Sequence, residues 1–166
     1  ILACHSDTAL KILGDATPTE KEILGDIPYQ ANEVILHTDA SIMPKNKKAW
    51  ASWNYRLPKS ASRDATVTYW MNKLQGFSDG PEFLVSLNQG QDIAPEKILG
   101  SFQYDHPVYT RETVIAQQRY SEIGSGRTHF CGAYWHYGFH EDGVKSGLRV
   151  CESIQRKIKR ESTKAA

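Results

Sequence analysis

Hydrophobic and polar positions alternate along the middle of the chain, whereas they recur every three or four residues towards its ends. Two short helices are predicted first. The segment His5-Ser6-Asp7 offers capping oxygens to a helix over about residues 8–13, which Gly14 is expected to close in the left-handed conformation. A second helix is predicted to start at the capping box and proline of residues 17–20 and to stop at Gly25.

Runs of β-branched and aromatic residues between Ile27 and Tyr109 predict a sheet. Strict alternation within one run places Trp53 and Tyr55 on the same face. Glycines and prolines lie in the connections, and the spacing suits an antiparallel meander. The predicted strands cover residues 33–38, 49–57, 66–71, 83–87 and 98–104.

The last third of the chain predicts a helix over 110–120, a short strand over 128–133 and a long helix over 140–158. Gly143 and Gly147 lie on one side of the long helix, a spacing typical of close approach to a backbone or a flat ligand. The basic tail of this helix is interpreted as a solvated last turn. Its apolar stripe, with a cysteine that we expect in the core, comprises Val144, Leu148, Cys151, Ile154 and Ile158.

Composition is that of a globular protein: of 166 residues 40% are hydrophobic and 23% charged, and the formal net charge is +1. Such a balance gives no global charge for holding nucleic acid or an anionic membrane. No apolar run approaches the ~20 residues of a transmembrane helix. Three cysteines are an odd count that favours reduced thiols, and hence a cytoplasmic location.

The first residues, Ile1 to Cys4, read as the end of a buried strand. We therefore expect the 166 residues to be a fragment of a longer polypeptide. Strand edges left open by a missing part could also support a homodimer.

The segment from Phe130 to Gly143 is the most specific feature of the sequence. It combines a strand, a glycine-rich bend and a helix whose first turn presents free backbone N–H groups. Such a helix end attracts phosphates, carboxylates and the electron-rich edge of a heterocycle. A strand-to-helix connection that needs its glycines only for packing is the alternative.

The pattern F-C-G-A-Y-W…G-F-H-E-D-G-x-x-S-G-L-R-V over residues 130–150 resembles the C-terminal flavin-contacting motif of the flavin-dependent amine oxidase and polyene desaturase superfamily. Within it, the chain is most similar to the bacterial predicted NAD/FAD-binding oxidoreductases, a group similar to the flavoprotein domain fused to plant cyclopropane fatty-acid synthases. Further stretches that carry this resemblance are residues 1–7, 28–33, 36–39, 49–55, 67–72 and 104–107.

The resemblance implies an α+β fold, with a mainly antiparallel substrate-domain sheet, flanking helices and a terminal strand and helix of an FAD-binding domain. It divides the chain into residues 1–15 (end of an FAD-domain strand and a short helix), 16–122 (substrate-binding domain) and 123–166 (FAD-contacting strand and helix). No G-x-G-x-x-G occurs in the sequence, so the Rossmann βαβ part is absent from it. The 166 residues alone are therefore expected to bind FAD weakly or not at all and to be inactive.

The resemblance also implies site residues. Phe139 matches an aromatic residue on the substrate side of the flavin, and with Trp53 and Tyr55 it would line an apolar pocket. Ala133 stands where such enzymes carry an acidic residue near the ribityl–pyrophosphate region of the flavin. Position 139 carries Phe instead of Tyr, and a partner for an aromatic cage is missing, so an amine substrate is not supported. The residues implied in FAD binding are Gly132, Ala133, Gly138, Phe139, His140, Glu141, Asp142 and Gly143. No catalytic residue can be assigned.

Other chemistry is considered beside this one. His136 and His140, with Glu141 and Asp142, superficially resemble a helical metal pair, but Gly138 lies between them, and we expect no metal site. A nucleophilic thiol is a second alternative, against which Cys4 and Cys131 are expected to be buried strand-end residues. Candidate proton-transfer pairs are His37 with Asp39 and Asp105 with His106, which surface loops would explain equally well.

Two functions follow. The first is the C-terminal part of an FAD-dependent oxidoreductase that transfers a hydride from an organic, apolar or lipid-like substrate to the flavin. The alternative is a non-catalytic ligand-binding or interaction domain derived from the same fold.

Overall fold

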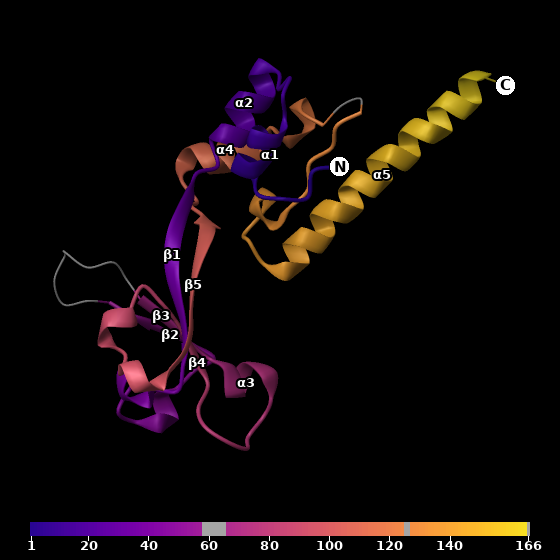
Figure 1. Ribbon diagram of the computed structural model, residues 1–166. Helices are drawn as coiled ribbons and strands as arrows, with labels where there is room; N and C mark the ends of the chain where they lie inside the picture. Colours follow the sequence, from indigo (N-terminus) through magenta and orange to yellow (C-terminus); the bar gives the residue numbers. More distant parts are fainter. Residues whose placement is uncertain (58–65, 125–126, 166) are drawn as a thin grey trace. The chain divides into compact units, whose positions relative to one another are not determined.

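The computed structural model describes residues 1–57, 66–124 and 127–165, and these form two compact units (Figure 1). Unit 1 comprises residues 1–30 and 107–166, and unit 2 comprises residues 31–106. The helices are α1 (Ser6–Ile12), α2 (Pro18–Gly25), α3 (Met71–Gln75), α4 (Arg111–Gln118) and α5 (His140–Ala165), and the strands are β1 (Tyr29–His37), β2 (Trp53–Arg56), β3 (Thr66–Trp70), β4 (Leu84–Leu87) and β5 (Ile98–Pro107).

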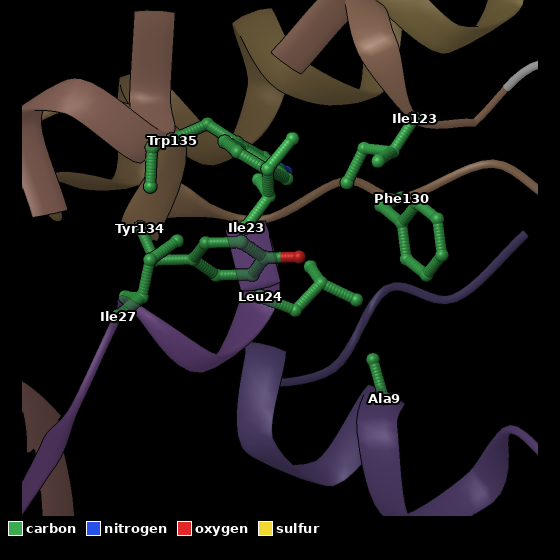
Figure 2. Close-up of a cluster of buried hydrophobic side chains, with 9 residues drawn as sticks. Ala9, Ile23, Leu24, Ile27, Ile123, Phe130, Tyr134 and Trp135 are labelled. Carbon is green, nitrogen blue, oxygen red and sulfur yellow. The ribbon is translucent and has the colours of Figure 1, made fainter. Parts of the chain in front are cut away.

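Unit 1 is built on an apolar cluster to which α1, α2, α4 and the segment before α5 contribute (Figure 2). The predicted capping box starts α2: the Thr17 hydroxyl accepts from the Glu20 N–H, and the Glu20 carboxylate accepts from the Thr17 N–H. Because α1 and α2 are short, the cluster rather than helix propensity holds them in place. Its fully or nearly fully buried members are Ala9, Ile23, Leu24, Ile27, Ala116, Ile123, Phe130, Tyr134 and Trp135.

The sheet has five strands within the described residues, in the order β2-β3-β4-β1-β5. The fold class is therefore α+β with an antiparallel sheet and flanking helices, as the sequence predicts. The predicted meander is correct only for β2, β3 and β4. β1 lies between β4 and β5, because the long connection after β1 carries the chain to the far edge of the sheet, where β2 begins.

The two faces of this sheet differ in chemistry. One face carries apolar side chains in register, with Trp53 opposite Tyr69 and Tyr69 opposite Val85. The other face carries polar ones, with Asn54 opposite Thr68 and Thr68 opposite Ser86. These polar residues are buried together with Leu84 and Ile35 of the same face. Ser86 and Thr68 are 0% and 4% exposed, whereas the Trp53 side of the edge strand is open.

Helix α5 corrects the predicted packing of the last helix. Val144 and Leu148 are 56% and 58% exposed, and Cys151 is exposed instead of lying in the core. The buried side of the helix carries Asp142, Ser146 and Val150. A polar stripe packs inward because its side chains accept backbone N–H groups from the preceding loop, which apolar residues cannot do.

Several boundaries also differ from those expected. Gly14 is not left-handed, because α1 ends at Ile12 with an extended Leu13 as its C-cap. The compact units meet at 30/31 and 106/107, since α2 and α4 join α1 around the apolar cluster of unit 1, and the functional division at 15/16 and 122/123 stays a prediction. None of the helices in the described ranges combines the length and the apolar character needed to cross a membrane.

Candidate cofactor site

The segment leading to α5 is paired with the first residues of the chain. Leu2 forms a parallel bridge with Phe130, in which the Leu2 N–H donates to the His129 carbonyl at 2.7 Å and the Cys131 N–H donates to the Leu2 carbonyl at 3.0 Å. The predicted strand over 128–133 is thus reduced to this bridge. Pairing nevertheless fixes the position of the glycine-rich bend at the point where it leaves the sheet-like segment.

Gly132 admits the ring of Tyr134. A Cβ atom at this position would lie 2.3 Å from Cε1 of Tyr134, which no side chain can tolerate. Its N–H donates to the Ser146 hydroxyl on α5 at 3.1 Å. Gly132 therefore has a packing role within unit 1, while its contact with a cofactor stays a prediction. Ala133 follows it in a short 3-10 turn over Ala133–Trp135.

Two long polar side chains, those of Gln117 and Arg149, form hydrogen bonds to the glycine-rich bend. The Gln117 side-chain amide donates to the carbonyls of Tyr134 and His136, at 2.8 and 2.7 Å. The Arg149 guanidinium donates to Nε2 of His136 at 2.8 Å and lies 4.5 Å from the centre of the Tyr120 ring. Donors such as Gln117 satisfy backbone carbonyls of the bend, which favours the conformation in which these bonds form.

Asp142 closes the turn into the helix. Its Oδ2 atom accepts from the N–H groups of Tyr137 and Phe139, both at 3.1 Å, and the residue is 8% exposed. A carboxylate in the first turn also stabilises the helix through the dipole. Asp142 thus serves as a scaffold for the turn, and a direct contact with a cofactor is not required to explain it.

Gly138 is required by its backbone conformation and by a neighbour. Its φ angle is +86°, which side chains other than that of glycine rarely adopt. A Cβ atom there would lie 2.7 Å from the hydroxyl oxygen of Tyr109. Burial raises the pKa of that Tyr109 hydroxyl, with the charges of Tyr29 and Asp142 adding to the effect. Tyr109 therefore lies in the site with its hydroxyl group protonated at pH 7.

The open side of the turn faces solvent. Tyr137 and Phe139 are 80% and 53% exposed, and His140 and Glu141 are exposed beside them. In the described part of the chain, the N–H groups of His140 and Glu141 donate to no acceptor. The structure therefore brings the eight residues implied in FAD binding together at one end of α5, with two backbone donors free.

The helix glycines have no close neighbour that explains them. A Cβ atom on Gly147 would meet nothing within 4 Å, and one on Gly143 would meet only the Ala133 Cβ at 4.0 Å. Both positions are half-buried next to the exposed apolar stripe of α5. The close approach predicted from their spacing is therefore not made to any described residue.

The geometry favours neither a nucleophilic thiol nor a metal site. Burial raises the pKa of the Cys131 thiol, which keeps it protonated and weakly nucleophilic. His136, of the supposed metal pair with His140, is bonded to Arg149, and the neighbouring Asp142 accepts from the backbone of the turn. Across residues 1–57, 66–124 and 127–165, no group of three or more metal-ligating side chains comes together.

The predicted proton-transfer pairs of unit 2 are also structural. His37 is fully buried, and its Nδ1 accepts from the Asp39 backbone N–H at 3.1 Å, so that the Asp39 carboxylate is not bonded to the ring. That carboxylate accepts from Lys97 Nζ instead, at 2.9 Å. The His106 ring is bonded to the Asn32 side chain at 3.0 Å, a partner other than the predicted Asp105.

Trp53 and Tyr55 lie on the apolar face of the sheet, 54% and 65% exposed, as their alternation predicts. Trp53 packs edge-on against Tyr69, with ring centres 5.8 Å apart. The two residues belong to unit 2 and Phe139 to unit 1, and a pocket common to the three stays a prediction.

Sequence reasoning missed the roles of Tyr109, Gln117 and Arg149 in holding the site. Arg149 carried a signal, because it lies within the pattern over residues 130–150. Tyr109 follows the last strand and Gln117 lies on α4, and neither position carried a recognisable signal.

Comparison with known proteins does not identify the chain. No protein-family model matches it, and no curated protein matches it significantly.

Proposed function

We propose that this chain supplies the ring-facing turn and the substrate-facing sheet of an FAD-dependent oxidoreductase. The observation that carries the proposal is the open turn from Tyr137 to Glu141, which presents two unbonded N–H groups at the start of a long helix. The pyrophosphate of the cofactor would have to be held outside these residues, because their sequence has no G-x-G-x-x-G.

The described residues fit a flat heterocycle. Gly138 leaves the turn without a Cβ atom, and the open space beside Gly143 and Gly147 would let a ring or another backbone approach the helix closely. Exposed aromatic side chains at Tyr137 and Phe139 offer stacking surfaces. A strand-to-helix connection without a ligand explains Gly132 and Asp142. It does not explain the exposed aromatic side chains or the open space beside the helix glycines.

When bound, the flavin would accept a hydride and would carry negative charge on the pyrimidine side of its ring. The N–H groups of His140 and Glu141 would orient that edge of the ring and donate to it. The dipole of a helix end is worth ~0.3–1 kcal/mol towards such a charge when exposed. Asp142 offsets part of this effect but holds the two donors in place. The apolar face around Trp53 would exclude water from an apolar substrate.

The proposal is tested by titrating residues 1–166 with FMN, which carries the flavin ring without the adenosine part, and recording amide shifts by NMR. We expect saturable shifts at residues 137–143 with a dissociation constant of about 1–10 mM, because a ring without its anchor makes few contacts. ADP is the matched control and should leave these amides unchanged. Shifts confined to other residues, or none at all, would overturn the proposal.

A substitution sharpens this test. Proline is tolerated at the first position of a helix, so His140→Pro removes one N–H donor without breaking α5. FMN binding should weaken about 2- to 10-fold, the value of one hydrogen bond of about 0.5–1.5 kcal/mol. Glu141→Gln keeps its N–H and should bind FMN as the unchanged chain does. Equal affinity of His140→Pro would show that the N–H group does not contact the ring.

A further inference from the structure

A cavity of about 500 Å³ lies in unit 2, next to the polar face of the sheet. Residues 54–57, in and after the edge strand β2, form one wall, and Ser41 to Lys45 form another. Thr68 of β3 and Gln89, which follows β4, complete it. A cavity of this size is in the range that holds a small organic ligand. It shares Tyr55 with the apolar face that the proposed oxidoreductase function uses, but its polar lining has no part in that function.

The hydroxyl of Thr68 is the end of a buried hydrogen-bond chain with a fixed direction. His37 Nδ1 accepts from the Asp39 N–H at 3.1 Å, so the ring proton of neutral His37 is on Nε2. Burial lowers the pKa of His37, which keeps the ring neutral. Nε2 therefore donates to the Ser86 hydroxyl at 2.9 Å.

The next hydrogen bond of the chain runs from the Ser86 hydroxyl to the Thr68 hydroxyl. Ser86 has already accepted from His37, and among the described residues the only acceptor for its own proton is the Thr68 hydroxyl at 2.8 Å. Thr68 thus accepts from Ser86 and keeps its own proton for another partner. Because Thr68 is 4% exposed and lines the cavity, an acceptor atom in the cavity can take this hydrogen bond.

Gln89 presents a second polar group to the same space. The residue is 2% exposed and lines the cavity. A side-chain amide in this position can donate to or accept from a polar ligand atom.

The remaining lining residues favour a ligand that has a negative charge and an apolar part. Lys45 and Arg56 are exposed cations of the lining, and Arg56 forms a long ion pair with Asp92, at 4.0 Å. Ile42 and Met43 add apolar surface.

We propose that this cavity binds a small organic carboxylate, with its anionic group against Lys45 and Arg56 and a second acceptor oxygen towards Thr68 and Gln89. A short hydrocarbon segment between the two groups would contact Ile42 and Met43.

The experiment uses 4-oxopentanoate, which has a carboxylate, a ketone and a short chain. Binding is followed by amide shifts of residues 1–166, and shifts are expected at Met43, Arg56, Thr68 and Gln89. The uncharged 4-oxopentanamide and the ketone-free pentanoate are the matched probes. We expect the amide to bind about 2- to 5-fold more weakly, as for one partly exposed ion pair, and pentanoate about 2- to 10-fold more weakly, as for one hydrogen bond.

Variants separate the two contacts. Arg56→Gln should remove the preference for 4-oxopentanoate over its amide, and the exposed Lys73→Gln should keep it. Thr68→Val, of similar shape, should remove the preference over pentanoate. If Thr68→Val does not fold, the Arg56→Gln comparison still decides. Shifts outside the cavity, absence of binding, or equal binding of all three probes would overturn the proposal. FMN binding at α5 is independent of each outcome.

Discussion

The centre of unit 1 and the centre of the sheet in unit 2 are stabilised by different interactions. In unit 1, apolar side chains such as Phe130 and Trp135 are buried, and hydrogen bonds hold the turns around them. In the sheet, a hydrogen-bonded chain of Ser86, Thr68 and His37 is buried beside Leu84, whereas the aromatic residues of the edge strand β2 are exposed. The difference teaches that a structural core can contain a polar chain as well as apolar side chains. Exposed apolar residues at one edge of a sheet are typical of a surface that contacts another molecule.

The largest expected effect tests the apolar centre. Trp135→Ala should lower the free energy of unfolding by about 3–5 kcal/mol, because a large side chain that is 2% exposed leaves a cavity. Urea denaturation followed by circular dichroism measures it. Phe102→Ala, at a residue 47% exposed, is the control and should change it by less than about 1 kcal/mol. Equal effects would mean that the cluster is not the centre of unit 1.

The next effect concerns Asp39 and has a defined pH dependence. Burial by itself would raise the pKa of Asp39, but hydrogen bonds from Ala94, Lys97 and Ser41 hold it well below its ordinary 3.8. A carboxyl group with a lowered pKa in the folded state stabilises the fold above its ordinary value. That contribution is lost as the pH falls below about 4.

Asp39→Asn should therefore lower the free energy of unfolding by about 1.5–3 kcal/mol at pH 7, as expected for hydrogen bonds to a charged group. The difference between the two proteins should shrink progressively below pH 4. Urea denaturation at a series of pH values is the measurement. A difference that is constant with pH would exclude this role, and the exposed Asp79→Asn should show no difference at either end of the range.

The polar centre of the sheet is tested by Ser86→Ala. The substitution leaves His37 Nε2 and the Thr68 hydroxyl without their shared partner, which should cost about 1–3 kcal/mol. Hydrogen exchange of β3 and β4 amides reports the loss locally. Ser78→Ala, at an exposed position, is the control. If Ser86→Ala were neutral, the chain of hydroxyls would not contribute to the stability of unit 2.

The smallest effect has the opposite sign. Gly147→Ala should raise the free energy of unfolding by about 0.5–1 kcal/mol, since alanine favours the helix and its Cβ meets nothing within 4 Å. If a flavin approaches this side of α5, the same substitution should weaken FMN binding. Higher stability with unchanged FMN affinity would show that the flavin contacts the turn and not this side of α5. Lower stability would show that Gly147 has a neighbour in solution.

Local signals in the sequence determined the elements of this protein. The capping box from Thr17 starts α2, alternation places Trp53 and Tyr55 on one face, and the glycine-rich bend before His140 leads into a long helix. These features depend on interactions within a few residues, which a single sequence displays.

Only the tertiary structure decided which side of each element is buried. Periodicity indicated the apolar stripe of α5 as its inner side, but Asp142 and Ser146 pack inward because they satisfy N–H groups of a loop that folds back on them. The tertiary structure likewise placed β1 between β4 and β5 and joined Ser86 to His37, 49 residues apart. Hydrogen-bond partners distant along the chain leave no periodic signal, and so the sequence alone could not reveal them.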